Sequence, residues 1–422
     1  MNEPRPTVST ARRAVVLVID ACGVGALPDA RAYGDEGTNT LAHLADAVGG
    51  LRLPTLQALG LGSIVPLAGV PASADPAIHG RLHPLGPGKD SISGHWELMG
   101  VVAQRALPTY PEGFPPHLLA LLERATGHEL ICNRPDNGIA AIEEFGAEHL
   151  RSRALILYTS QDSVLQLAAH TDVVGVEDLY RACAAARAVM SGEHAVGRVI
   201  ARPFTGAAGA FARTHGRRDF ALRPPARSYL QELQDAGVPV HGVGKIHDLF
   251  AGVGVDVAHD GATNARALSA VEELLAGLER GLVFANLIET DQVYGHRKDA
   301  EGFARALREI DTRLAVMLER LRHDDLLILT ADHGVDLAHP GTDHTREYAP
   351  LLAVSGEMLA VRAGGGRLGG ARHDGVLADV GATVLTWLTG RGAAVEPGEG
   401  APSGDGPPSG EGALRGGAFI RP

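Results

Sequence analysis

Six side chains of the types that bind divalent metals follow three apolar runs, each of which has the pattern of a buried parallel strand. The carboxyl ends of parallel strands meet at one edge of a sheet, so these groups are expected to lie together. Carboxylate and imidazole ligands without thiolates suit Mn²⁺ or Zn²⁺, and three ligands per ion leave positions open for a substrate. Any one of them could instead be a helix cap or a surface charge, but six at strand ends favour two metal sites. The six are Asp20, Asp291, His296, Asp332, His333 and His344.

A second candidate is the loop from Gly88 to Glu97, which reads Gly-Lys-Asp-Ser-Ile-Ser-Gly-His-Trp-Glu. A hydroxyl in such a loop becomes a nucleophile when a metal or a base lowers its proton affinity. If the loop opens a helix, its backbone N–H groups would bind a phosphate. Because Ser/Gly loops are common, spacing alone leaves an ordinary turn as an equally good interpretation.

The elements that position these groups alternate between strand and helix. Apolar runs at 14–19, 238–243, 281–288 and 326–330 predict strands. Apolar residues at steps of three and four from Phe303 to Leu321 predict an amphipathic helix. This alternation predicts an α/β fold with a mostly parallel sheet and helices on both faces.

The middle of the chain interrupts this order with a strand at 155–158, a helix at 176–190 and a strand at 199–204. We therefore expect a discontinuous metal-binding core, residues 1–101 and 223–392, with an inserted cap domain at 102–222. Between Glu396 and Gly412 most residues are Gly, Pro or Ser. Such a composition buries too little apolar surface to offset the entropy of ordering, so residues 393–422 are expected to be a disordered tail.

Composition narrows the class of protein. The chain has 422 residues and a net charge of −12, which argues against a nucleic-acid or anionic-membrane partner. Three widely spaced cysteines form no disulfide framework and fit a reducing compartment. No secretory signal and no apolar run of ~18 residues is present, so a cytoplasmic protein is expected. The sequence names no protein partner.

These motifs together resemble the phosphopentomutase family of the alkaline phosphatase superfamily, a relative of cofactor-independent phosphoglycerate mutase. The Gly88–Glu97 run and the Thr-Asp-His-Thr-Arg-Glu run at 342–347 are highly specific to this family. The resemblance implies an alkaline-phosphatase-like core with an inserted α+β cap, and phosphoryl transfer between C1 and C5 of ribose or deoxyribose. It covers nearly all of residues 14–390, through Val15–Asp20, Gly88–Gly100, Tyr158–His170, Gly197–Phe204, Val243–Gly254, Asn286–Asp299, Thr330–Tyr348 and Asp379–Leu388.

The resemblance also assigns roles. Ser91 would carry the phosphoryl group. Two Mn²⁺ ions per chain would be bound, with Mg²⁺, Co²⁺ or Zn²⁺ as substitutes, and a sugar bisphosphate such as glucose 1,6-bisphosphate or ribose 1,5-bisphosphate would activate the enzyme. One metal site would use Asp291, His296 and His344, and the other Asp20, Asp332 and His333 together with the Ser91 oxygen.

The partners implied by the resemblance are small pentose phosphates, in nucleoside and deoxyribose catabolism and pentose phosphate supply. The candidate substrate contacts lie in the cap segments and in the Val243–Gly–Lys–Ile run. They are Ser160, Asp162, Val164, Arg198, Ile200, Arg213 and Lys245.

Three positions depart from the family pattern. Ser91 stands where threonine is usual, but it keeps the hydroxyl, so activity is expected to survive. Glu289 stands where aspartate is expected, and Cys22 stands near Asp20, where packing is a better interpretation than metal binding.

Two rival functions remain on the residues alone. A metal-dependent phosphatase or phosphodiesterase on the same fold would transfer the phosphoryl group to water, since fold alone does not set the acceptor. It would not need the cap segment at 160–164 with Arg198 and Lys245. A non-catalytic metal- or phosphate-binding protein would be favoured by loss of Ser91 or of a ligand, and all of these residues are present.

Overall fold

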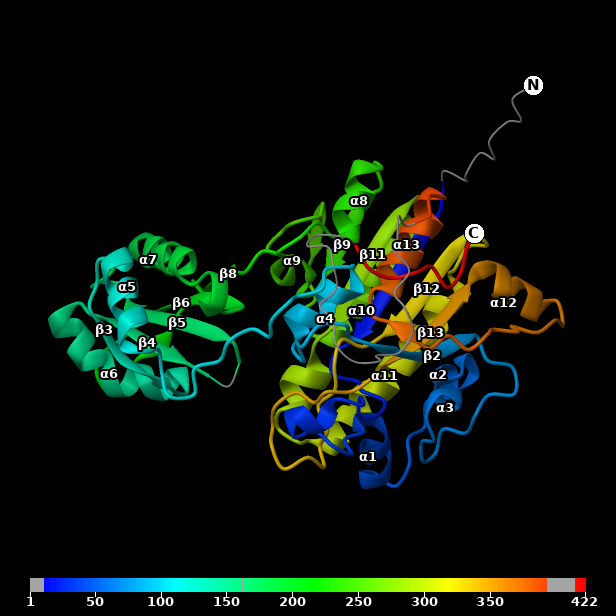
Figure 1. Cartoon of the computed structure of the whole chain (residues 1–422), viewed down its shortest axis with the longest axis horizontal. Helices are drawn as coiled ribbons and strands as arrows, with labels where there is room; N and C mark the ends of the chain where they lie inside the picture. The colour runs from blue at the N-terminus through cyan, green and yellow to red at the C-terminus, as the bar shows by residue number, and fades with distance from the viewer. Residues whose placement is uncertain (1–10, 161, 393–413) are drawn as a thin grey trace. The chain divides into compact units, whose positions relative to one another are not determined.

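The structure, a computed structural model, describes residues 11–160, 162–392 and 414–422. It divides into two compact units (Figure 1). One, called the core unit, consists of Met1–Ala106 and Pro224–Pro422, and the other, the cap unit, is Leu107–Arg223. Residues 414–422 belong to the core unit.

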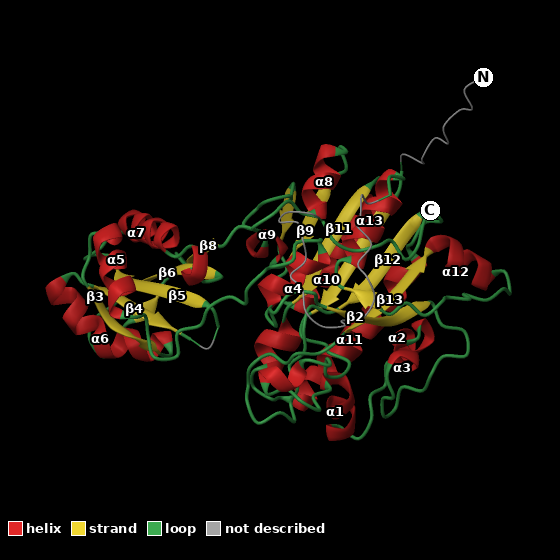
Figure 2. Cartoon of the chain, viewed as in Figure 1, coloured by secondary structure: helices red, strands yellow, loops and turns green. Residues whose placement is uncertain are grey.

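The core unit is built on one mixed sheet flanked by helices (Figure 2). Five neighbouring strands are parallel, and the sheet turns antiparallel where β13 pairs with β12 and with β2. The fold class is therefore the expected α/β class with a mostly parallel sheet. The strand order is β10 (Val257–His259), β9 (Val240–Val243), β11 (Gly281–Leu287), β1 (Arg13–Ile19), β12 (Asp325–Thr330), β13 (Ala349–Ser355), β2 (Ile78–His83) and β14 (Gly375–Val376).

The core-unit helices follow the periodicity of the sequence. The longest, α11, buries Phe303, Leu307, Ile310, Leu314 and Met317 and exposes most of its charged residues, whereas Asp311 is buried. No helix within the described residues is long and apolar enough to cross a membrane. The helices are η1 (Ala30–Tyr33), α1 (Thr40–Ala47), α2 (Pro54–Leu59), α3 (Leu61–Ile64), α4 (Ser91–Leu98), α8 (Tyr229–Asp235), α9 (Ile246–Leu249), α10 (Asn264–Gly277), η3 (Thr290–Gly295), α11 (Ala300–Glu319), α12 (Gly356–Ala363) and α13 (Asp379–Thr389).

The centre of the sheet fixes the edge at which the candidate ligands emerge. Every residue of β1, β11 and β12 is buried, as continuous apolar runs predict for parallel strands covered on both faces. β1 lies between the other two in parallel register, with Ile19 opposite Leu287. At the opposite end, Arg13 pairs with Asp325, and both side chains are buried. The residues that follow the three strands therefore share one edge.

The cap unit has its own sheet with helices on both faces. Helices α5 and α7 pack on one face around Leu118 and Leu179, and α6 packs on the other around Ile142. The strands run in the order β3 (Leu130–Pro135), β4 (Leu155–Thr159), β5 (Val164–His170), β6 (Arg198–Thr205) and β7 (Ala212–Arg213), with β8 (Arg218–Ala221) also paired to β6. The helices are α5 (Pro116–Thr126), α6 (Gly138–Ser152), α7 (Val176–Val189) and η2 (Gly192–His194).

Residues 414–422, which were expected to be disordered, are packed. Residues 393–413 lie outside the described part of the chain, but residues 414–422 pack on the core unit. Gly417 N donates to Asp379 Oδ1 at 2.6 Å, and Phe419 N donates to Thr383 Oγ1 at 3.1 Å. The expectation of disorder rested on the composition of 396–412. Beyond it Leu414, Phe419 and Ile420 supply the apolar side chains that a packed segment needs.

Candidate metal centre

The six candidate ligands gather at the carboxyl edge of the core sheet. Asp20 follows β1, Asp291 lies in η3 after β11, and Asp332 follows β12. One group of possible ligand atoms consists of Asp291, His296 and His344, and a second of Asp20, Asp291 and His333. Within each group the ligand atoms lie within 4.8 Å of one another. Parallel strands deliver the groups to one place, as the strand pattern predicts.

The Asp291 group depends on a local distortion of the backbone. η3 is a π-helix, in which the His296 N–H donates to the Asp291 carbonyl, five residues back, at 3.2 Å. This winding puts both side chains on one side, and His296 Nε2 lies 3.4 Å from Asp291 Oδ1. His344 Nε2 lies at the same distance from that oxygen. Single π-turns are frequent at functional sites, but a sequence pattern does not reveal them.

The remaining ligands surround Asp20. His333 Nε2 lies 3.5 Å from Asp20 Oδ1 and 3.3 Å from Asp332 Oδ2. Asp332 Oδ1 accepts from the Ala21 N–H at 3.1 Å. Asp20 Oδ2 accepts from the side-chain amide of Asn286 at 3.0 Å, which leaves Oδ1 directed at the cluster. Asp20, Asp332 and His333, the expected second set, thus lie in contact, but the second group of possible ligand atoms contains Asp291 in place of Asp332.

The histidine tautomers are set by backbone carbonyls. His296 Nδ1 donates to Thr342 O at 2.7 Å, and His333 Nδ1 donates to Gly334 O at 3.1 Å. Each ring therefore carries a proton on Nδ1, and Nε2 is the nitrogen that faces the carboxylates and would bind a metal. Backbone or carboxylate partners that fix the ring in this way are typical of metal-binding histidines.

The three carboxylates that pack together have different pKa shifts. Burial, together with the charges of Asp332 and Asp291, raises the pKa of Asp20 well above its ordinary value. Burial alone would also raise the pKa of Asp291, but the neighbouring His344 and His296 hold it well below the usual range. Burial would raise the pKa of Asp332 too, and His333 and His95 lower it. The centre thus concentrates negative charge that a cation would compensate.

Within the described part of the chain, several carboxylate oxygens of the cluster lack hydrogen-bond partners, which also fits the binding of divalent ions. Asp20 Oδ1, Asp291 Oδ1 and Asp332 Oδ2 are buried and lack a hydrogen-bond partner among the described residues. A buried carboxylate oxygen without a partner is costly, so native structures rarely keep several side by side. Metal ligation satisfies all three at once. Oxygen and imidazole donors without sulfur suit Mn²⁺, Zn²⁺ or similar ions.

Ser91 lies against this cluster at the first turn of α4. Its Oγ is 3.1 Å from His333 Nε2, and since that nitrogen is the acceptor, the hydroxyl donates. Asp90 caps the helix by accepting from Ile92 N and Ser93 N, each at 3.0 Å. Ser93 Oγ in turn donates to Asp90 Oδ2 at 2.7 Å, so the second hydroxyl of the loop is committed to the cap.

Hydrogen bonds of charged side chains connect the Ser91 loop to the motif at 342–347. Arg346 Nη1 donates to Gly88 O at 2.7 Å, and the Arg346 backbone N–H donates to Asp35 at 2.8 Å. Lys89 Nζ lies 3.0 Å from the same aspartate. Gly94 allows α4 to approach closely, because a Cβ there would lie 2.5 Å from Asp332 O. These contacts fix the Ser91 loop against the segments that carry Asp332 and Arg346.

Two side chains with supporting roles escaped the sequence reasoning. His95, within the Gly-His-Trp-Glu run, contacts Asp332 from α4. Glu347, in the late motif, accepts from Thr40 N at 2.9 Å and from Thr345 Oγ1 at 2.7 Å. Both residues lie inside the family-specific motifs, and this position is the sequence signal that could have identified them. A histidine or glutamate among apolar neighbours gives no spacing pattern that reveals a partner distant in sequence.

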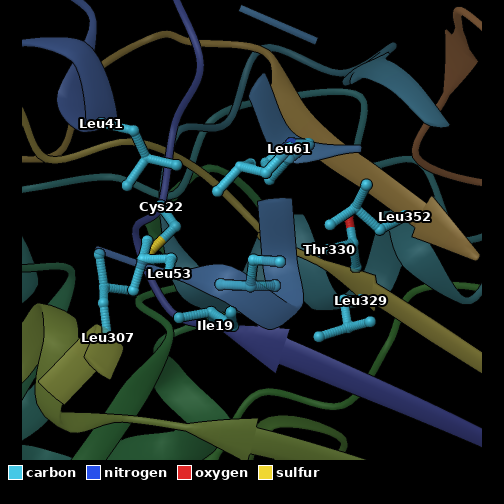
Figure 3. A pocket seen from close by; sticks show the side chains of 11 residues that line it. Ile19, Cys22, Leu41, Leu53, Leu61, Leu307, Leu329, Thr330 and Leu352 are labelled. Carbon is cyan, nitrogen blue, oxygen red and sulfur yellow. The ribbon is translucent and has the colours of Figure 1, made fainter. Parts of the chain in front are cut away.

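Cys22 lines an apolar cavity together with the last residues of β1 and β12, Ile19 and Thr330 (Figure 3). Burial, together with the charges of Asp20 and Asp332, raises the pKa of its thiol well above the ordinary value, so it stays protonated. Its role is therefore packing. The other lining residues are almost all aliphatic and offer nothing to a phosphate: Ile19, Leu41, Leu53, Leu56, Leu61, Leu307, Leu329, Thr330, Pro350 and Leu352.

The cap residues expected to contact substrate fall into two groups within the cap unit. Val164 and Arg198 are paired across β5 and β6, and the Arg198 guanidinium lies 3.9 Å from Asp162. Ser160 Oγ accepts from the Asp162 N–H at 3.3 Å, and Ile200 is buried two residues along β6. Arg213 is instead on β7, opposite Phe204, and six residues along β6 is about 20 Å. The first group is contiguous and Arg213 is apart from it.

Lys245 and Glu289 lie in the core unit. Lys245 follows β9, and its charge acts to lower the pKa of Asp20, although burial of that carboxyl dominates. The longer side chain of Glu289 has a use of its own, because its Oε2 accepts from the Asn264 N–H at the start of α10, at 2.7 Å. Glu289 therefore adds an acceptor for the first N–H group of α10, whose N-cap is Thr263.

Comparison with known proteins places the chain in a family. The sequence model described as "Metalloenzyme superfamily" matches residues 12–390. The chain is 46% identical to the phosphopentomutase of Caldanaerobacter subterraneus over 88% of this chain and 93% of that protein. It is 49% identical to the phosphopentomutase of Anaeromyxobacter sp. strain K, over 89% and 95%. Among solved structures, Leishmania mexicana phosphoglycerate mutase matches at 14% identity and a TM-score of 0.46, over 97% of this chain and 98% of that one. On the family match and these identities, the chain belongs to the phosphopentomutase family of the metalloenzyme superfamily.

Proposed function

We propose that this protein interconverts the 1-phosphates and 5-phosphates of ribose and deoxyribose through a phosphorylated Ser91. Members of its family are isomerases of the intramolecular phosphotransferase type, EC 5.4.2.7, and so is this chain. The observation that carries the proposal is the position of the Ser91 hydroxyl, 3.1 Å from His333 Nε2 and beside the Asp/His cluster. We further propose that it acts in the cytoplasm, in nucleoside and deoxyribose catabolism and pentose phosphate supply.

The reaction consists of two phosphoryl exchanges at one oxygen. The bond between phosphorus and Ser91 Oγ breaks as a bond to the sugar hydroxyl oxygen forms, the proton of that hydroxyl ends on Ser91 Oγ, and the product is a pentose 1,5-bisphosphate. The sugar then reorients, its other phosphate returns to Ser91 Oγ, and the isomer leaves. A sugar bisphosphate such as glucose 1,6-bisphosphate or ribose 1,5-bisphosphate would load a serine that has lost its phosphate. Little covalent work falls on the protein, so positioning and charge neutralisation dominate.

Two divalent ions, Mn²⁺ first and Mg²⁺, Co²⁺ or Zn²⁺ as substitutes, fit the donor set. Asp291, His296 and His344 would hold one, and Asp20, Asp332 and His333 the other. When bound, such ions neutralise charge on the transferring phosphoryl group and favour the ionised serine oxygen. The chain itself orients that oxygen, since Asp90 caps α4 and His95 Nδ1 donates to the Ser91 carbonyl at 2.8 Å.

The substrate partners of the proposed reaction are small pentose phosphates. In the cap unit, Arg198 has a side chain 28% exposed and offers a forked cation suited to a phosphate. Ser160, Asp162, Val164, Ile200 and Arg213 are the other proposed contacts there, and Lys245 is the one in the core unit. A phosphatase would need no grip on the far end of the sugar phosphate, which is why these residues favour a mutase.

The deciding experiment follows both the product and the serine. Ribose 1-phosphate is supplied with Mn²⁺ and a trace of bisphosphate, and ribose 5-phosphate is measured against free phosphate. The proposal expects ribose 5-phosphate as the main product, with one phosphate on the peptide that contains Ser91. Ser91→Thr should stay active and Ser91→Ala should not. Mainly free phosphate, an active Ser91→Ala enzyme, or phosphate on Ser93 would each contradict it.

A further inference from the structure

Helix α13 is mostly apolar and is buried on every side, so it depends on cover from all of its neighbours. All residues from Asp379 to Leu388 are buried, including Thr383 and Thr386. A helix without a polar face is stable in a globular protein only when it is enclosed. Strands β1 and β11 and helices α4 and α8 contact it. The C-terminal segment, defined as residues 414–422, completes the enclosure beside α13 (Figure 1).

Three hydrogen bonds anchor the C-terminal segment on this surface. Asp379, at the start of α13, accepts from the Gly417 N–H at 2.6 Å, and Thr383, one turn later, accepts from the Phe419 N–H at 3.1 Å. The Tyr229 hydroxyl of α8 donates to the Arg415 carbonyl at 3.0 Å. The segment thus binds through its backbone to side chains of two helices. Backbone contacts of this kind hold the segment in one alignment along the two helices.

Side-chain and steric contacts make the fit specific. The Phe419 ring lies 5.2 Å from the ring of His373, and His373 Nε2 is itself 2.8 Å from Asp379. Gly416 has φ of 103°, and a Cβ there would lie 2.3 Å from the carbonyl group of Ala378. Only glycine therefore fits at 416. The neighbouring Gly417 is different, because a Cβ there would meet no atom within 4 Å.

The same contacts reach the base of the helix that carries Ser91. α4 ends at Leu98, and the Met99 carbonyl accepts from the Tyr229 N–H at 2.9 Å. A Cβ at Gly100 would approach the Tyr229 ring to 2.6 Å and the Leu414 side chain to 3.0 Å, so these three pack together. Tyr229 therefore bridges the C-terminal segment to the end of α4 opposite Ser91.

We propose that the C-terminal segment is an intramolecular clamp: it docks on α13 and Tyr229 of its own chain and secures the base of α4. The segment lies beyond residues 12–390, the part that matches the family. The docking surface on α13 and Tyr229 is occupied by this segment of the same chain. The proposal does not depend on which reaction the enzyme performs.

The adjacent glycines supply a matched pair of variants in the full-length chain. Gly416→Ala should undock the segment and lower the Tm by roughly 2–4 °C, whereas Gly417→Ala should keep the wild-type Tm. A free peptide of residues 414–422 should then restore the Tm of the Gly416→Ala protein. The same peptide carrying the Gly416→Ala change should not. Equal Tm values for the two variants, or no response to the wild-type peptide, would overturn the proposal.

Hydrogen exchange tests the link to α4 without any activity assay. In Gly416→Ala, amides of residues 96–101 and 379–388 should exchange faster than in Gly417→Ala, while those of β5 in the cap unit stay unchanged. Unchanged exchange at 96–101 would refute the clamp on α4. A Tm of the wild-type chain that rises with protein concentration would mean that the surface takes the segment of a second copy, and would refute the intramolecular docking.

Discussion

His95 Nδ1 lies 3.2 Å from Asp332 Oδ2, and the side chains of both residues are fully buried. The same nitrogen donates to the Ser91 carbonyl at 2.8 Å. His95 therefore donates its Nδ1 proton to the helix that carries the nucleophile and also lies in contact with a carboxylate of the metal centre. Such an arrangement makes His95 a positioning residue: it orients Asp332 and Ser91 without contacting a substrate.

Replacing His95 tests this role through metal binding. His95→Leu removes the imidazole that lies against Asp332, so Asp332 loses its orientation and the affinity for Mn²⁺ should fall about 10- to 100-fold. His95→Asn keeps an N–H near the Nδ1 position and should recover much of the loss. Calorimetric titration of the apo-proteins with Mn²⁺ measures both. Equal affinities for wild type and His95→Leu would mean that the contact is only packing.

The metal content of the purified protein tests the two-ion assignment. Chelation should abolish activity and Mn²⁺ should restore it. His344→Ala should retain roughly one ion fewer per chain, since three-ligand sites rarely survive the loss of a ligand. His323→Ala is the matched control, because His323 is 64% exposed and lies away from the centre. An unchanged metal count in His344→Ala would argue against the assigned ligand set.

Glu97 should make stability depend on pH. Burial raises its pKa from the ordinary 4.5 to about 7, although the N–H groups of Leu85 and Gly86 oppose the shift. The folded state therefore holds this proton after the unfolded state has lost it. Stability must fall as the pH rises from 4.5 to 7, on the order of 3 kcal/mol from this group alone. Below pH 4.5 and above pH 7 the group adds no further slope.

Thermal unfolding at pH 5 and pH 8 measures this effect. The Tm of the wild type should drop more over this interval than that of Glu97→Gln, which cannot ionise. Glu301→Gln, on the exposed first turn of α11, should keep the wild-type difference. If Glu97→Gln shows the same drop as the wild type, Glu97 is already ionised at pH 5 in the folded protein.

Arg198 should affect the ratio of the two products more than the phosphoryl-transfer step itself. Losing one charge-assisted phosphate contact costs about 1.5–3 kcal/mol, or ten- to a hundredfold in rate. Arg198→Ala and Lys245→Ala should slow isomerisation more than hydrolysis and so raise the ratio of free phosphate to ribose 5-phosphate. Arg181→Ala, on the exposed face of α7, is the control. If both variants keep the wild-type rate and ratio, these residues do not hold the substrate.

The sequence by itself determined the fold class and the neighbourhood of the candidate ligands. Apolar runs ending in Asp20, Asp291 and Asp332 predicted parallel strands, and parallel strands that are neighbours must present their carboxyl ends together. The motif around Ser91 and the motif at 342–347 were enough to indicate the family. These are local patterns, and each depends only on residues close in the chain.

Only the tertiary structure decided how the parts interlock. The Ser91–His333 contact joins residues that are 242 positions apart, and the π-turn at 290–295 sets which face Asp291 and His296 share. The role of His95 and the packing of residues 414–422 were likewise beyond pattern reading. In the sequence Gly416 does not differ from the other glycines near the C-terminus, and only its contact with Ala378 sets it apart. Close contact between distant segments depends on which surfaces remain uncovered after the sheet and helices have packed, and the periodicity of a single element carries no information about that.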